Sequence, residues 1–139
     1  MRAVASFDFD SFDEDPPYRE EGVVRHHRAR IEKAFHGDLE GHGSVEMLAA
    51  RGDGGAGYVA LERISGTLNG RTGSFSLLHI GTMDGTELWA RWPVVPGSGS
   101  GELRRFVARA GSTSTPRATT PSRWTMSSTE GQACHDRFP

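Results

Sequence analysis

The dipeptide Asn69-Gly70 is the strongest local constraint in this sequence, because Asn-Gly is the favoured central pair of a two-residue type I′ hairpin turn. Short stretches of alternating apolar and polar residues flank it, which predicts an antiparallel hairpin with strands over 57–68 and 72–82. If Leu68 faces Arg71, the same register pairs Ile64 with Phe75, Glu62 with Leu77 and Ala60 with His79. These side chains share one face with Tyr58, and we expect that face to be the interior one.

Four further segments show the same alternation and predict strands over 3–12, 23–35, 43–50 and 87–95. Turns rich in Gly, Asp and Pro separate them. The charges of residues 23–35 also suit an exposed helix, but two β-branched valines at its start and the turn at 35–38 favour a long strand. No stretch keeps apolar residues at helical spacing, so the sequence predicts an all-β chain arranged as an antiparallel meander.

The strand pattern ends at Leu103. A six-stranded antiparallel sheet has two exposed edges, which closure into a barrel would remove. Residues 104–139, however, are rich in Ser, Thr and Pro and carry few apolar side chains. We therefore expect a small antiparallel β-barrel domain over 1–103 that is incompletely closed, a flexible connection at 97–101, and a low-complexity, disordered tail over 104–139.

The charge of the chain argues against nucleic acid as a partner. Through Leu103 it holds 16 acidic and 10 basic residues, whereas binding of phosphate needs a basic face. No apolar run approaches the roughly 18 residues that span a bilayer, so we expect no membrane partner and a cytoplasmic location. The single cysteine, Cys134, has no disulfide partner.

Several spaced phrases resemble a bacterial family of unknown function, the domain of unknown function (DUF) family 3224. They occur in order as 35-FHGDLEG-41, 61-LER-63, 66-GTL-68, 73-GSF-75, 81-GTMDG-85 and 94-VVPGSG-99. The resemblance covers residues 3–103 and implies a small barrel similar to that of allene oxide cyclase, with no established activity. Family members continue with two further strand-like segments, from which this chain departs after Leu103. Back-translation of the protein sequence from that point, with mostly G or C as third bases, gives such segments when it is read one base earlier, so we interpret the tail as the product of a frameshift.

Two polar residues on the predicted interior face are candidate catalytic groups. The hairpin register makes Glu62 and His79 diagonal neighbours, and a carboxylate beside an imidazole can orient it or transfer a proton. The alternative is a hydrogen-bonded pair within the core. Tyr58 on the same face and Trp89 at a barrel mouth complete the candidate ligand-binding set, while Glu46 is expected to face solvent. His26-His27 lacks metal-site geometry, and no motif indicates a cofactor.

Three functions fit this pattern. The first is a barrel that binds a small, largely apolar molecule in its mouth or interior. The second is an isomerase or cyclase similar to allene oxide cyclase, in which Glu62 and His79 steer an apolar substrate. The third is a structural module that forms a homo-oligomer through an open sheet edge.

Overall fold

The computed structural model of the chain describes residues 2–104, 108–109 and 122–128. Within these ranges every regular element is a strand, and no helix is long and apolar enough to cross a membrane. The strands are β1 (Arg2–Glu14), β2 (Arg19–Glu21), β3 (Val24–Gly37), β4 (Leu39–Arg51), β5 (Gly55–Leu68), β6 (Arg71–Asp84), β7 (Glu87–Arg91), β8 (Ser100–Gly101), β9 (Ala108–Arg109) and β10 (Ser122–Ser128).

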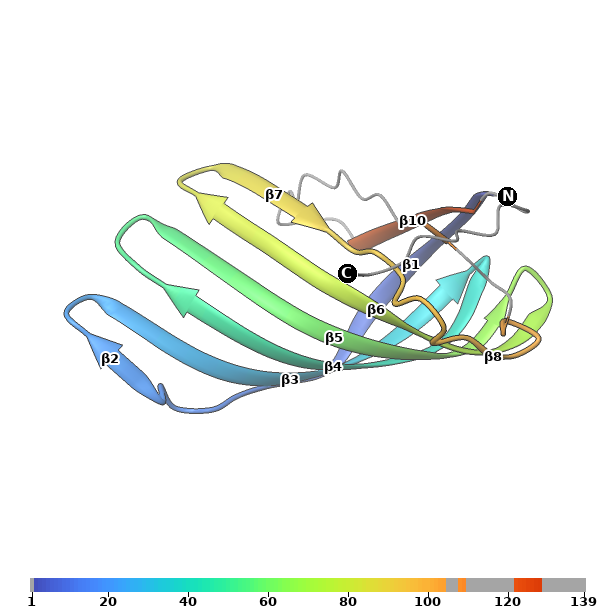
Figure 1. Cartoon of the computed structure of the whole chain (residues 1–139), viewed down its shortest axis with the longest axis horizontal. Helices are drawn as coiled ribbons and strands as arrows, with labels where there is room; N and C mark the ends of the chain where they lie inside the picture. Colours follow the sequence, from blue (N-terminus) through green and yellow to red (C-terminus); the bar gives the residue numbers. More distant parts are fainter. Residues whose placement is uncertain (1, 105–107, 110–121, 129–139) are drawn as a thin grey trace, which may run out of the picture.

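These strands form one curled antiparallel sheet (Figure 1). Its path runs β7-β6-β5-β4-β3-β1-β10-β9, with β2 added to β3 and β8 added to β6. Among the strands described, no pairing joins β7 to β9, so the sheet is a half-barrel. The predicted all-β, incompletely closed architecture is confirmed.

The β5–β6 hairpin has the predicted register. Leu68 pairs with Arg71, and the ladder continues through Ile64 with Phe75, Glu62 with Leu77 and Ala60 with His79. Asn69 and Gly70 have φ values of 47° and 81°, as a type I′ turn requires at both central positions. The local turn chemistry therefore fixes which side chains of both strands face the core.

Residues 24–37 form a strand, as favoured over the helix. Alternate side chains of β3 are buried from Ala29 to Phe35, and β3 lies between β1 and β4. A strand in this place pairs its backbone on both sides, which an exposed helix could not do. A bulge between Phe9 and Ser11 shifts the facing ladder of β1.

Two details after β6 differ from the expectation. The predicted strand 87–95 is interrupted: β7 ends at Arg91, and past Pro93, which has no N–H to donate, pairing with β6 resumes at a bridge between Leu77 and Val94. Residues 97–101, expected as a flexible connection, are held against β6. The Ser98 hydroxyl accepts a hydrogen bond of 2.9 Å from the Ser76 N–H, and β8 pairs with Ser74 and Gly73.

We expected no strands after Leu103, but the described residues there form two, β9 and β10. β10 pairs with β1 from Arg2–Ser127 to Phe7–Ser122, and β9 pairs with β10. The apolar alternation of β10 is limited to Trp124 and Met126, which is too short to have indicated a strand from the sequence. The remainder of the expected tail lies outside the described residues.

The core covers one face of the sheet, which we call the buried face. Its main cluster contains Ala3, Ala5, Phe7, Phe35, Leu39, Ile64, Leu68, Phe75, Leu77 and Leu103, with Trp92 and Val94 packed against it. A second cluster of Ile31, Val45 and Ala60, flanked by Met47 and Tyr58, lies further along the same face. The predicted interior face of the hairpin is thus the buried one.

A row of glycines crosses the buried face where the sheet bends. Gly41 of β4 pairs with Gly66 of β5, which pairs with Gly73 of β6, and Gly73 pairs with Gly101 of β8. A Cβ atom at Gly41 would lie 2.8 Å from the Gly66 Cα atom. Backbones this close admit no side chain, and glycine is typical of such tight bends in barrels.

Candidate functional site

Three charged or polar side chains meet on the buried face. The Lys33 Nζ atom of β3 donates a hydrogen bond of 3.3 Å to Glu62 Oε2 of β5, and His79 Nε2 of β6 donates one of 2.6 Å to the same oxygen. Lys33, Glu62 and His79 are 6, 1 and 4 % exposed. We call these three residues the buried cluster. It joins three strands of the sheet through one carboxylate.

Gly43 of β4 makes the buried cluster sterically possible. It pairs with Lys33 on one side and Ile64 on the other, so it lies between the lysine and the glutamate strand. A Cβ atom at Gly43 would collide with Glu62 Oε1 and would lie 2.9 Å from Phe35 Cε2. The absence of a side chain therefore lets the Glu62 carboxylate lie over β4.

An aromatic ring contacts each end of the buried cluster. Lys33 Nζ lies 4.5 Å from the centroid of the Phe7 ring, a cation–π contact, and the Trp92 ring lies 5.2 Å from the His79 ring at 38°. Within the described part of the chain, Glu62 Oε1 and Trp92 Nε1 are buried without a hydrogen-bond partner. Such atoms each cost about 1–3 kcal/mol of stability.

The surroundings of the buried cluster alter two pKa values. Burial raises the pKa of the Glu62 carboxyl, but the hydrogen bond from His79 and the charge of Lys33 outweigh it, so this pKa lies below its usual value. Burial lowers the pKa of Lys33, and the attraction of Glu62 opposes this only in part. The carboxylate is consequently ionised at neutral pH and able to fix the orientation of the His79 imidazole.

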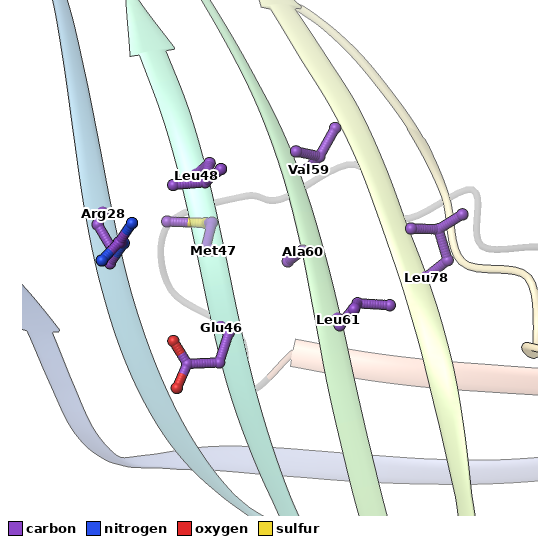
Figure 2. A pocket seen from close by; sticks show the side chains of 8 residues that line it. All are labelled: Arg28, Glu46, Met47, Leu48, Val59, Ala60, Leu61 and Leu78. Carbon is purple, nitrogen blue, oxygen red and sulfur yellow. The ribbon is translucent and has the colours of Figure 1, made fainter. Parts of the chain in front are cut away.

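The opposite, exposed face of the sheet carries an apolar groove of about 500 Å³. Figure 2 shows side chains from four neighbouring strands, β3 to β6, around it. The residues that line it, which we call the apolar groove, are Arg28, Glu46, Met47, Leu48, Val59, Ala60, Leu61 and Leu78. Leu48 pairs across the ladder with Val59, and Leu61 pairs with Leu78, so the apolar surface is continuous over three strands.

A second groove of about 330 Å³ adjoins the first and shares Leu48 and Val59 with it. Its lining also includes Tyr18, His26, Tyr58 and Thr82. Thr82 pairs with Trp89 of β7, whose ring faces the Arg91 guanidinium at 5.4 Å. Trp89 therefore lies beside this groove, with 47 % of its surface exposed.

The structure divides the four predicted site residues between two places. Glu62 and His79 are brought together as the register predicts, but neither lines a described groove. Tyr58 packs against the second core cluster on the buried face and also borders the second groove, whereas Trp89 pairs with Thr82, which lines that groove. Glu46 faces solvent as expected and borders the apolar groove.

Sequence reasoning missed Lys33 and the apolar groove, although signals for both exist. Lys33 occupies a position at which the residues two before and two after it, Ile31 and Phe35, are apolar. An alternation of this kind places its side chain on the core face. The groove is indicated by Val59, Leu61 and other apolar residues on the face of the hairpin that was expected to contact water.

No group of three or more His, Cys, Asp or Glu side chains in the described ranges is placed to hold a metal ion. At the predicted His pair, His27 Nδ1 lies 3.2 Å from Glu14 Oε1, and the His26 ring packs edge-on against Tyr18. Both histidines thus have contacts typical of a protein surface.

Comparison with known proteins identifies relatives of unknown function. The family model described as "Protein of unknown function (DUF3224)" matches residues 3–120. A solved structure from Shewanella oneidensis MR-1, a protein with unknown function from the same family, is 33 % identical in sequence with a TM-score of 0.77. The match covers 91 % of this chain and 94 % of that one. No curated protein matches this chain.

Proposed function

This chain belongs to the DUF3224 family of proteins of unknown function, and we propose that it binds a small, largely apolar molecule in the apolar groove. The observation that carries the proposal is the groove itself. Its volume of about 500 Å³ lies within the range of small-molecule sites, and apolar side chains from three strands line most of it.

Exposure of these side chains supports the same conclusion. Val59 and Leu61 are 49 and 57 % exposed, although both are large apolar residues on a strand in the middle of the sheet. Apolar surface that is contiguous rather than scattered is typical of a binding site. A ligand that covers this surface would remove it from water, which favours binding by about 25 cal/mol for each Å².

Titration with phenylnaphthylamine, a neutral probe that fluoresces in apolar surroundings, tests this function. We expect wild-type protein to bind the probe and Val59→Lys to weaken binding at least about tenfold, because a charge in the groove must be desolvated. Ser65→Lys places the same charge on the same strand and face outside the groove and should leave binding unchanged. Absence of binding to wild type, or equal binding to Val59→Lys, overturns the proposal.

An isomerase or cyclase similar to allene oxide cyclase is the second candidate function. The 2.6 Å contact between Glu62 and His79 favours it, since a carboxylate that fixes an imidazole can assist proton transfer. This function requires an apolar ligand beside the buried cluster. A crystal structure with bound phenylnaphthylamine separates the two candidates: a probe in the apolar groove supports the binding protein, and one against Glu62 and His79 supports the isomerase.

A structural or oligomeric role is the third candidate, and the free edge of β7 favours it, because β7 pairs with β6 alone among the described strands. A second copy that adds a strand there would double the mass in solution. Light scattering at micromolar concentration measures this mass directly, and a monomer would exclude the role.

We also propose that the segment after Leu103 arose by a change of reading frame in a cytoplasmic protein, although β9 and β10 within it join the sheet. Its Ser, Thr and Pro content and the loss of strand alternation support this. Sequencing this gene and those of close relatives tests the proposal. A single-base difference near codon 103 should restore the strand-like segments of the relatives, and the absence of such a difference would overturn the proposal.

A further inference from the structure

We propose that the ligand of the apolar groove is an amphipathic anion, an apolar body that carries one carboxylate or sulfonate group. This inference rests on the proposed function and specifies its ligand class. The residue that carries it is Arg28, the one cationic side chain in the lining of the groove. Arg28 is exposed and pairs across the ladder with Leu48, so its guanidinium borders the apolar surface.

The neighbouring arginines of β3 have carboxylate partners. Arg25 Nε lies 3.5 Å from Glu20 Oε1, and Arg30 Nε lies 3.6 Å from Glu46 Oε1. Within the described residues no carboxylate forms an ion pair with Arg28. A cation that borders an apolar groove without a protein partner is complementary to a ligand that brings its own anion.

Glu46 is the one acidic residue in the lining, and its charge would repel such a ligand. Its ion pair with Arg30 offsets this repulsion, because Arg30 balances the charge of Glu46 and the charge of Arg28 stays uncompensated. The planar guanidinium of Arg28 also matches a carboxylate or sulfonate better than a point charge would, since it offers parallel N–H donors. Arg28 therefore favours a negative group on the ligand, while the leucines and Val59 of the groove favour an apolar body.

Two probes with the same aromatic skeleton separate this inference from the proposed function. Anilinonaphthalene sulfonate differs from phenylnaphthylamine by its sulfonate group. We expect wild-type protein to bind the sulfonate about fivefold more tightly than the neutral probe at low salt, the range of an exposed ion pair. This preference should disappear in about 1 M salt, where exposed charges are screened within a few ångströms.

Variants assign the preference to Arg28. Arg28→Gln should abolish the preference for the sulfonate and leave binding of phenylnaphthylamine within about twofold. Arg63→Gln, which removes the same charge from the same face outside the groove, should change neither. Glu46→Gln should tighten sulfonate binding, which gives a second test that keeps Arg28 intact.

The outcomes are distinct. If both probes bind wild type equally, or if Arg28→Gln keeps the full preference, the anion is not recognised by Arg28 and this inference is wrong, while the proposed function stands. If Glu46→Gln weakens sulfonate binding, the electrostatic account of the rim is also wrong. If neither probe binds wild-type protein, the proposed function fails as well.

Discussion

His79 Nε2 lies 2.6 Å from Glu62 Oε2 on the buried face, and Lys33 Nζ shares that oxygen at 3.3 Å. One carboxylate thus compensates a buried ammonium and an imidazole on two different strands. Breaking such an arrangement by removing one partner is strongly destabilising, because it leaves an uncompensated charge inside the protein. The following variants test what this contact contributes.

Glu62→Leu should lower the free energy of unfolding by about 3–5 kcal/mol at pH 7, since Lys33 then stays buried without a carboxylate. Urea denaturation followed by circular dichroism measures this change. Glu46→Leu is the matched control on the exposed face, where the loss of an ion pair should cost at most about 1 kcal/mol. Equal effects of the two variants would show that the buried cluster contributes no special stability.

Acid should destabilise the protein through Glu62. Its folded-state pKa lies below the ordinary value of 4.5, so the unfolded state binds more protons in the interval between the two. The contribution of Glu62 to the free energy of unfolding is fully present above pH 4.5 and is lost as the pH falls through the folded-state pKa. Urea denaturation at a series of pH values should show the gap between wild type and Glu62→Leu narrowing below 4.5. A constant gap would contradict this assignment.

Alkaline pH should act in the opposite direction through Lys33. Its folded-state pKa lies below 10.5, so the unfolded state again binds more protons between the two values. In that interval the Lys33 contribution makes the folded state more stable as pH rises. Lys33→Met removes the titrating group and keeps a long side chain, so its stability should lack this upward component. A wild-type curve that falls relative to Lys33→Met below 10.5 would refute the prediction.

Gly43→Ala should destabilise the protein by about 1–3 kcal/mol, because the added methyl group collides with Glu62 Oε1 and crowds Phe35. Gly57→Ala is the control on the next strand, where the nearest atom to a new Cβ is the Gly81 carbonyl oxygen at 3.6 Å. Thermal unfolding of both variants separates the effect of the collision from that of losing a glycine. Similar melting temperatures would mean that Glu62 moves aside without cost.

The parts of the fold that local chemistry determines could be predicted from the sequence. Asn69 and Gly70 fix the β5–β6 register, and that register alone placed Glu62 beside His79. β10 was not predicted, because its apolar alternation consists only of Trp124 and Met126 within a segment rich in Ser and Thr. The turn at 96–99 set the predicted end of the strand at Val95, and the bridge between Val94 and Leu77 shows pairing beyond Pro93, although the regular strand ends at Arg91.

The candidate site was predictable in part for the same reason. A turn sets distances between neighbouring strands, whereas the Lys33–Glu62 contact spans β3 to β5 across Gly43 and depends on two registers together. Lysine is also most often exposed, which hides a buried one among surface charges. Trp89 was expected at a barrel mouth, but the groove beside it depends on how β4, β5 and β6 lie together.

The glycine row from Gly41 to Gly101 sets the curvature of the sheet with backbone atoms alone. Because the glycines of this row carry no side chains, residues on either side of the row can change in size without altering the bend of the sheet. The shape of the sheet and the chemistry of its exposed face can therefore change independently of each other.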